Sequence, residues 1–260
     1  MAKGGWVTFP HKHASYSYAG AALKKNWDRL HRGDCEPYPK DEGAQDAWRM
    51  FHAGLFEEAC GVGASAGASG INAASKAASI YANYLEPAES KQVKIFEDVA
   101  TRCEALQKAD PKNVNAYYLY AYALGRYSQL VGVAKALAQG IAGKVKSSLD
   151  MTLQLEPKHA DAHVAVGAYH AEIIAKVGGL VGGLTYGANK DKSIEHYQMA
   201  LKLNPDSAIA RIEYANGIVM LFGKSRMRDA ERLYEEAANC TPADATEKLD
   251  VELAKEEADD

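Results

Sequence analysis

The chain of 260 residues is 47% hydrophobic and 25% charged, with a formal net charge of −4, which is typical of a globular protein with one large or two ordinary domains. The negative charge argues against nucleic acid or an anionic membrane as the main partner. The longest apolar run, residues 173–184, contains Lys176 and four glycines and is too short to span a bilayer. We therefore expect neither nucleic-acid binding nor membrane insertion.

The start of the chain carries no recognisable export signal. Residues 1–13 lack the apolar core of a signal peptide, and we expect them to form a flexible start. The four cysteines are scattered without a C-x-x-C pair, as is usual for reduced thiols. These features predict a cytoplasmic protein.

Residues 14–111 are expected to form divergent N-terminal helical hairpins, because apolar residues recur there at the spacing of a helix face. A small-residue insert at 61–70 interrupts them and is expected to be a packing or flexible loop. The predicted helices of this part cover residues 16–31, 44–60, 71–85 and 90–108.

A longer repeated unit fills residues 112–242. Prolines close its copies at 111, 157, 205 and 242, at spacings of 46, 48 and 37 residues, and each proline ends the helix before it. In the copy at 157–205, the small residues Ala162, Gly167 and Ala200 let two antiparallel helices approach closely. One such hairpin cannot bury its apolar stripe alone, so several must stack.

This layout of small, aromatic and closing proline residues resembles the tetratricopeptide (TPR) pattern. It predicts an all-α, TPR-like solenoid of stacked antiparallel hairpins with about eleven helices. Ordinary units are nearer ~34 residues, so the excess length is assigned to Gly-rich inserts at 131–143 and 178–187. Residues 243–260 are expected to form a capping helix and acidic tail. We expect the whole chain, 1–260, to be a single helical-repeat domain.

Three runs within about residues 110–222 carry a narrower resemblance. Residues 120–128, 178–187 and 210–217 are similar to the T component associated with tripartite periplasmic (TRAP-type) transporters. The resemblance implies a helical-repeat bundle with a ligand cleft, a homo-oligomer and a substrate-binding partner protein.

Motifs for catalysis or cofactors are weak. The glycines of residues 61–67 follow a predicted helix rather than a strand, so they do not predict a dinucleotide site. His159, His163 and His170 share one helical face, but they span about 16 Å, and the repeat frame turns the last two into the hairpin core and leaves His159 in the turn. Neither paired carboxylates nor a nucleophile–base set has a local signature. We predict no catalytic residue, no cofactor and no metal site.

The inner face of each hairpin's first helix is expected to line a concave surface that holds a peptide segment or small organic ligand. Val164, Ala168, Ile209, Ile212 and Met220 are placed on this face by the same frame. The predicted binding residues are Asn115, Tyr118, Tyr122, Arg126, Asp161, Glu172 and Asn216.

The insert at 178–187 is expected either to pack on a neighbouring helix or to form a mobile flap over the groove, and its key residues are Gly182, Gly183 and Tyr186. Packing is favoured because Leu180, Val181 and Leu184 provide apolar side chains to bury. The predicted function is a non-enzymatic binding or scaffold module, and an adaptor to a transport-type solute-binding partner is one form that it could take. The alternatives are an enzyme with a site assembled across helices and a purely structural oligomer with exposed apolar patches.

Overall fold

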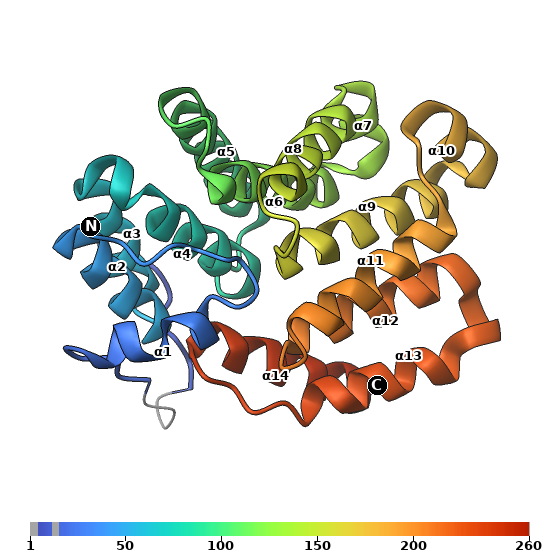
Figure 1. The fold of residues 1–260 in the computed structure, drawn as a ribbon. Helices are drawn as coiled ribbons and strands as arrows, with labels where there is room; N and C mark the ends of the chain where they lie inside the picture. The colour runs from blue at the N-terminus through green and yellow to red at the C-terminus, as the bar shows by residue number, and fades with distance from the viewer. Residues whose placement is uncertain (1–4, 12–15, 260) are drawn as a thin grey trace. The chain divides into compact units, whose positions relative to one another are not determined.

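The computed structural model describes residues 5–11 and 16–259, with side chains up to Glu257, and every regular element in this part is helical (Figure 1). The prediction of an all-α fold is confirmed. The elements are α1 (Ala22–Leu30), α2 (Glu42–His52), α3 (Phe56–Ser65), the 3₁₀ helix η1 (Gly67–Ser69), α4 (Ile71–Tyr84), α5 (Glu89–Ala109), α6 (Val114–Val131), α7 (Val133–Ala138), α8 (Ile141–Leu155), α9 (Ala160–Val177), α10 (Gly179–Tyr186), α11 (Lys190–Leu203), α12 (Ala208–Phe222), the 3₁₀ helix η2 (Gly223–Arg226), α13 (Met227–Ala238) and α14 (Ala245–Asp259).

The chain divides into two compact units that are discontinuous in sequence. The first contains Met1–Leu30, Glu36–Ile141 and Asp244–Thr246, and the second contains His31–Cys35, Ala142–Ala243 and Glu247–Asp260. Each unit therefore includes a short segment from a distant part of the chain. The single domain expected from the sequence remains a prediction.

In the first unit, two predicted helices are wrong in extent, and a left-handed glycine explains each error. The helix expected from residue 16 begins only at Ala22, after Gly20 with a φ of +54°. The helix expected over 44–60 is two helices, α2 and α3, separated at Gly54 with a φ of +82°. Left-handed backbone ends a helix and favours glycine.

The insert at 61–70 is mostly helical, and the expectation of a loop there is wrong. Its first half continues α3, and its second half is η1. A Cβ built on Gly63 would lie 2.7 Å from the carbonyl oxygen of Gly70 and 2.9 Å from the amide nitrogen of Ala74. The glycines therefore allow α3 and α4 to pack backbone against backbone.

Residues 5–11 of the predicted flexible start lie against the first unit. The Trp6 ring stacks on Tyr81 with 4.1 Å between centroids, and Phe9 meets Phe56 edge to face. Residues 1–4 and 12–13 of that start lie outside the described residues.

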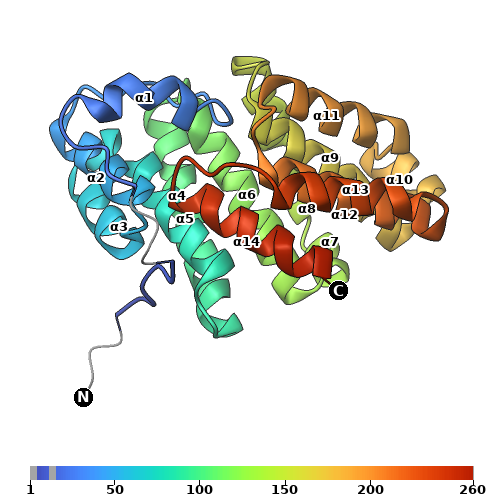
Figure 2. The same cartoon turned by 90° about the horizontal axis from the view of Figure 1, so that it is seen from below.

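In the second unit, α9, α11, α12 and α13 pack as successive antiparallel neighbours, and Figure 2 shows them side by side. The side chain of Tyr197 on α11 joins three of these helices. A Cβ on Gly167 of α9 would lie 2.9 Å from the Tyr197 ring, and one on Gly217 of α12 would lie 2.5 Å from it. The Tyr197 ring also stacks on Tyr214, with 5.2 Å between centroids. Small residues opposite a bulky one thus set the hairpin spacing, as the sequence predicts.

Helix ends follow the sequence signals. The helices before the four closing prolines end at Ala109, Leu155, Leu203 and Ala238. Side chains of Asn113, Asn189 and Ser207 accept hydrogen bonds from backbone amides at the starts of α6, α11 and α12, which satisfies donors that the helix leaves open. The helix count is higher than predicted because the inserts contain α7 and α10 and because the helix expected over 44–60 is divided into α2 and α3.

Within the described residues, no helix is both long and apolar enough to cross a membrane.

Substituting Gly217 by Ala is expected to lower the free energy of unfolding by about 1–3 kcal/mol, because the added methyl group overlaps the buried Tyr197 ring. Gly167→Ala should act in the same direction. Gly143→Ala in α8 is the control, since nothing lies within 4 Å of its Cβ and Ala is the better helix former. Urea unfolding of the three variants measures the difference, and equal stability for Gly217→Ala and Gly143→Ala would contradict the prediction.

Candidate functional site

The predicted binding residues of α6 are largely internal. Asn115 and Tyr118 are 3% and 8% exposed, so neither presents its side chain to an open groove. Tyr122 and Arg126 are half-buried, with the Arg126 guanidinium 5.4 Å from the centroid of the Tyr122 ring. This cation–π pair is the part of the predicted α6 surface that a ligand could still reach.

The predicted binding residues of the second unit do not form one group. Asp161 begins α9, where its backbone N–H donates to the carbonyl of Gly33. Glu172 is half-buried near the other end of the same helix. Asn216 on α12 accepts a hydrogen bond from the Tyr234 hydroxyl.

Several apolar residues that the repeat frame placed on the concave face pack inside the second unit instead. Ile212 is buried with Val251 and Ala254 of α14, and Ile209 packs against the same cluster. Val164 and Ala168 pack against the core around Tyr197. These side chains hold helices together because the stacking turns them into the interior of the second unit.

The insert with Gly182, Gly183 and Tyr186 forms α10, a short helix on α9. Gly182 is buried, and a Cβ there would lie 3.3 Å from Ile173. The backbone carbonyl of Tyr186 accepts a hydrogen bond from the Tyr169 hydroxyl. However, the apolar side chains of this helix do not pack inward as expected, since Leu180, Val181 and Leu184 are 77%, 50% and 82% exposed.

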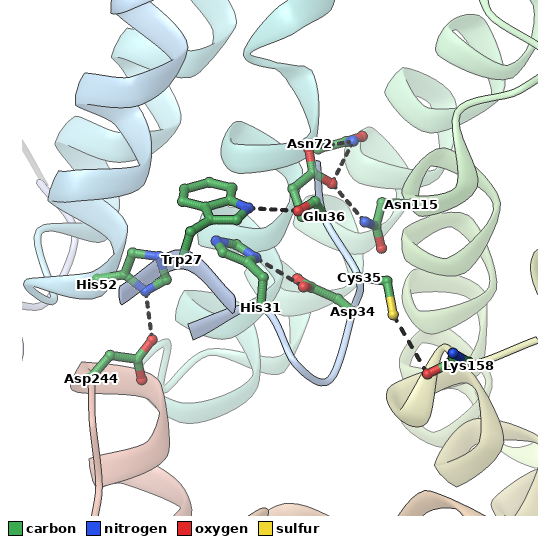
Figure 3. Close-up of polar contacts among 10 residues, drawn as sticks. All are labelled: Trp27, His31, Asp34, Cys35, Glu36, His52, Asn72, Asn115, Lys158 and Asp244. Carbon is green, nitrogen blue, oxygen red and sulfur yellow. Dashed lines mark hydrogen bonds and ion pairs between the residues drawn. The ribbon is translucent and has the colours of Figure 1, made fainter. Parts of the chain in front are cut away.

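A buried carboxylate in the first unit explains the position of Asn115 (Figure 3). Glu36 is buried, and its carboxylate accepts hydrogen bonds from Asn72 Nδ2 at 3.0–3.1 Å and from Asn115 Nδ2 at 2.6 Å. The backbone carbonyl of Glu36 accepts from the indole of Trp27 at 2.7 Å. Hydrogen bonds to a charged acceptor are among the stronger ones in proteins, so this arrangement fixes the loop at Glu36 against α1, α4 and α6.

Two histidine–carboxylate pairs, also drawn in Figure 3, are each buried within one unit. In the first unit, His52 Nδ1 lies 2.7 Å from Asp244 Oδ2 and joins α2 to the distant segment 244–246. In the second, His31 Nδ1 lies 2.9 Å from Asp34 Oδ1. Both carboxylates orient an imidazole. The first pair holds the segment 244–246 against α2, whereas the second lies within the segment 31–35.

A histidine cluster lies between α9 and α11 in the second unit. His163 and His170 project from α9 and His196 from α11, with ring centroids 4.9 Å apart for His163 and His196 and 6.2 Å for His170 and His196. The prediction that His163 and His170 point into the hairpin is confirmed. His159 lies before the helix, as predicted, and its Nδ1 accepts a hydrogen bond from the amide of Ala162.

Burial keeps these imidazoles neutral. It is the largest cause that lowers the pKa of His170 to about 4, with Lys192 and Lys146 acting in the same direction and Asp150 opposing them. Burial, then His163, His170 and Lys192, lower the pKa of His196 to about 4. The pKa of His163 is also lowered, again chiefly by burial. No group of three or more His, Cys, Asp or Glu residues in the described chain is arranged to hold a metal ion.

Sequence reasoning missed His196, the central member of the cluster. The spacing of residues along one helix cannot reveal His196 as a member, because its two partners lie on α9 and not on α11. The available signal was its position directly before Tyr197 on the return helix, which faces α9.

The comparisons with known proteins identify the fold. No protein-family model matches the chain, and no curated protein matches its sequence. In structure the chain is similar to a thermophilic TPR protein of Thermus thermophilus, with a TM-score of 0.57 and 15% sequence identity, over 82% of this chain and 97% of that one. The fold is therefore TPR-like. The resemblance to a transporter T component stays a prediction.

Acidic pH should destabilise the protein through His170. An imidazole whose pKa falls from 6.5 to about 4 on folding contributes stability above pH 6.5 that is lost as the pH falls toward 4, by up to about 3 kcal/mol. His170→Phe keeps a ring at this position and removes the titration. Urea unfolding between pH 7.5 and 4.5 should show a shallower loss for the variant than for the wild type, and identical slopes would contradict the assignment.

Asn115→Ala should destabilise the first unit by about 1.5–3 kcal/mol, because it removes a hydrogen bond to the buried Glu36 carboxylate. The exposed Asn239, whose side chain donates a hydrogen bond to the backbone carbonyl of Glu235, is the control, and its Ala variant should stay within about 0.5 kcal/mol of the wild type. Thermal unfolding compares the two. A stable Asn115→Ala protein would return this residue to the candidate ligand-binding set.

Proposed function

We propose that the chain is a helical-repeat scaffold that binds a protein partner through α10. The observation that carries the proposal is the exposure of three large apolar side chains on this helix, Leu180, Val181 and Leu184. Burying a leucine side chain contributes about 1.5–3 kcal/mol, and exposed apolar clusters commonly mark interaction sites. The TPR-like fold supports the proposal, because such repeats present extended surfaces for binding.

The backbone of α10 determines which way these side chains point. Gly178 and Gly187 flank the helix with φ angles of +81° and +66°, which an ordinary residue adopts at a cost. A Cβ built on Gly182 would lie 3.3 Å from the Ile173 side chain and 3.7 Å from that of Ile174, both on α9. Because Gly182 occupies the contact with α9, Leu180 and Leu184, one turn apart, are left exposed.

Tyr122 and Arg126 on α6 remain a second proposed surface of the first unit, for a peptide segment or small organic ligand. Glu172 on α9 remains a proposed binding residue of the second unit. A solute-binding protein of a transport system is the partner that the sequence resemblance favours, and it would be bound without catalysis by this chain.

A second copy of the chain is the other candidate partner, and the same exposed leucines favour it. Sedimentation velocity separates the two cases. If the wild type is an oligomer and the Leu180→Asp/Leu184→Asp variant is a monomer, the partner of α10 is a second copy of the chain. If the wild type is a monomer, the partner of α10 is a different protein.

The proposal predicts that a photoreactive phenylalanine at position 184, expressed in the native host, forms a covalent adduct with a specific protein. The same group at position 199 is the matched control, because Met199 is also exposed and apolar, at 39%, but lies on α11. Adducts should be specific to position 184 and should disappear when Leu180→Asp is added. Adducts of equal yield at both positions, or at neither, would count against α10 as the binding surface.

A further inference from the structure

The histidine cluster of α9 and α11 has a fixed direction of hydrogen bonding. His163 Nε2 lies 3.1 Å from the carbonyl oxygen of Pro157, which can only accept, so this nitrogen donates. A neutral His163 then has a bare Nδ1, which lies 2.8 Å from His196 Nδ1. His196 Nδ1 must be the donor of that bond. The neutral His196 ring is therefore left with a lone pair on Nε2.

This direction identifies the atom that can take up a proton. A proton added to His196 Nε2 leaves both hydrogen bonds intact, whereas one added to His163 Nδ1 would displace the bond from His196. His196 Nε2 makes no hydrogen bond with any residue that the structure describes. With the hydrogen bonds from Pro157 through His163 kept, His196 can become an imidazolium whose Nε2–H is not used by any residue that the structure describes.

The charges around the cluster favour an anion over a cation. Lys192 precedes His196 by one helical turn on α11, on the same face, and its ammonium has no partner among the described residues. Lys146 also acts on the cluster, while the opposing carboxylate of Asp150 is already paired with Lys146 at 2.6 Å. The Lys192 ammonium would repel a metal ion bound at the cluster, whereas it would form an ion pair with an oxyanion.

His170 adds a second observation. Its side chain is 5% exposed, and its Nδ1 is buried without a hydrogen-bond partner. An unsatisfied buried nitrogen costs free energy, so a molecule that the protein chain does not supply, a ligand atom or a water held with it, is expected beside this ring.

We propose that His196 Nε2 and Lys192 Nζ form a binding site for an oxyanion, a carboxylate or phosphate group, beside the His170 ring. The anion binds together with one proton, which is taken from solvent onto His196 Nε2. This site is separate from α10 and does not depend on the proposed scaffold function.

Anion binding should be coupled to proton uptake, because His196 is neutral when the site is empty. His196 is neutral near pH 6 because its pKa is about 4, and a bound negative charge raises that pKa. Besides burial, the groups that shift the pKa of His196 are His163 and His170 from α9, Asp150 from α8 and Lys192 from α11. Affinity should therefore weaken as the pH rises, by up to about tenfold per unit.

Isothermal titration of the full chain with sulfate tests the proposal, because sulfate keeps its charge between pH 5.5 and 7.5. We expect weaker binding at higher pH and proton uptake, read from the dependence of the heat on the ionisation enthalpy of the buffer. In ¹H–¹⁵N spectra of the wild type at pH 6.0, sulfate should convert His196 from the neutral to the doubly protonated ring. Acetate and inorganic phosphate, compared at pH 6.0, distinguish the carboxylate from the phosphate class.

Lys192→Gln should weaken the affinity for sulfate at least fivefold and keep its pH dependence. His196→Gln should abolish the pH dependence of the affinity. Lys202→Gln, an exposed lysine further along α11, is the control and should bind as the wild type does. Equal binding by Lys192→Gln and Lys202→Gln, or a His196 ring that stays neutral in wild-type protein at saturating sulfate, would overturn the proposal. A wild-type titration with no saturation would overturn it as well.

Discussion

The second unit depends on the close approach of three helices around one tyrosine ring. Tyr197 of α11 lies against Gly167 of α9 and Gly217 of α12, at distances that leave no room for a Cβ on either glycine. Close packing of this kind fixes helix separation, because interiors tolerate neither gaps nor overlap. The same contact holds α11 against α9, which brings His196 beside His163 and His170. The core packing and the histidine cluster therefore have one origin.

Much of the repeat could be predicted from sequence, because its determinants are local. Pro157 and Pro205 mark helix ends, and small residues at Gly167 and Ala200 mark close contacts. Left-handed backbone was harder to predict, since glycine occurs both inside helices and between them. Gly63 lies within α3, whereas Gly54 separates two helices, and neighbouring residues do not distinguish the two roles.

The candidate site was less accessible to sequence reasoning, because long-range contacts decide it. Asn115 was placed on a ligand-binding face by its helical position, but Glu36, 79 residues away, comes close enough to accept its hydrogen bond. Leu184 was expected to be buried because it is apolar, yet Gly182 of α10 occupies the contact with α9 and Leu184 is exposed. Side-chain character alone gives neither result, since both require knowledge of which face meets which neighbour.

The interleaved division of the chain has a consequence for its biosynthesis. The first unit contains Asp244–Thr246, and the second contains His31–Cys35, so a cut between residues 141 and 142 would deprive each piece of a segment that belongs to it. During translation the first unit cannot acquire its last segment, including the Asp244 partner of His52, until residues 244–246 have left the ribosome. Neither unit is therefore complete before residue 244 has been made, which argues against folding of the two units in succession from the N-terminus.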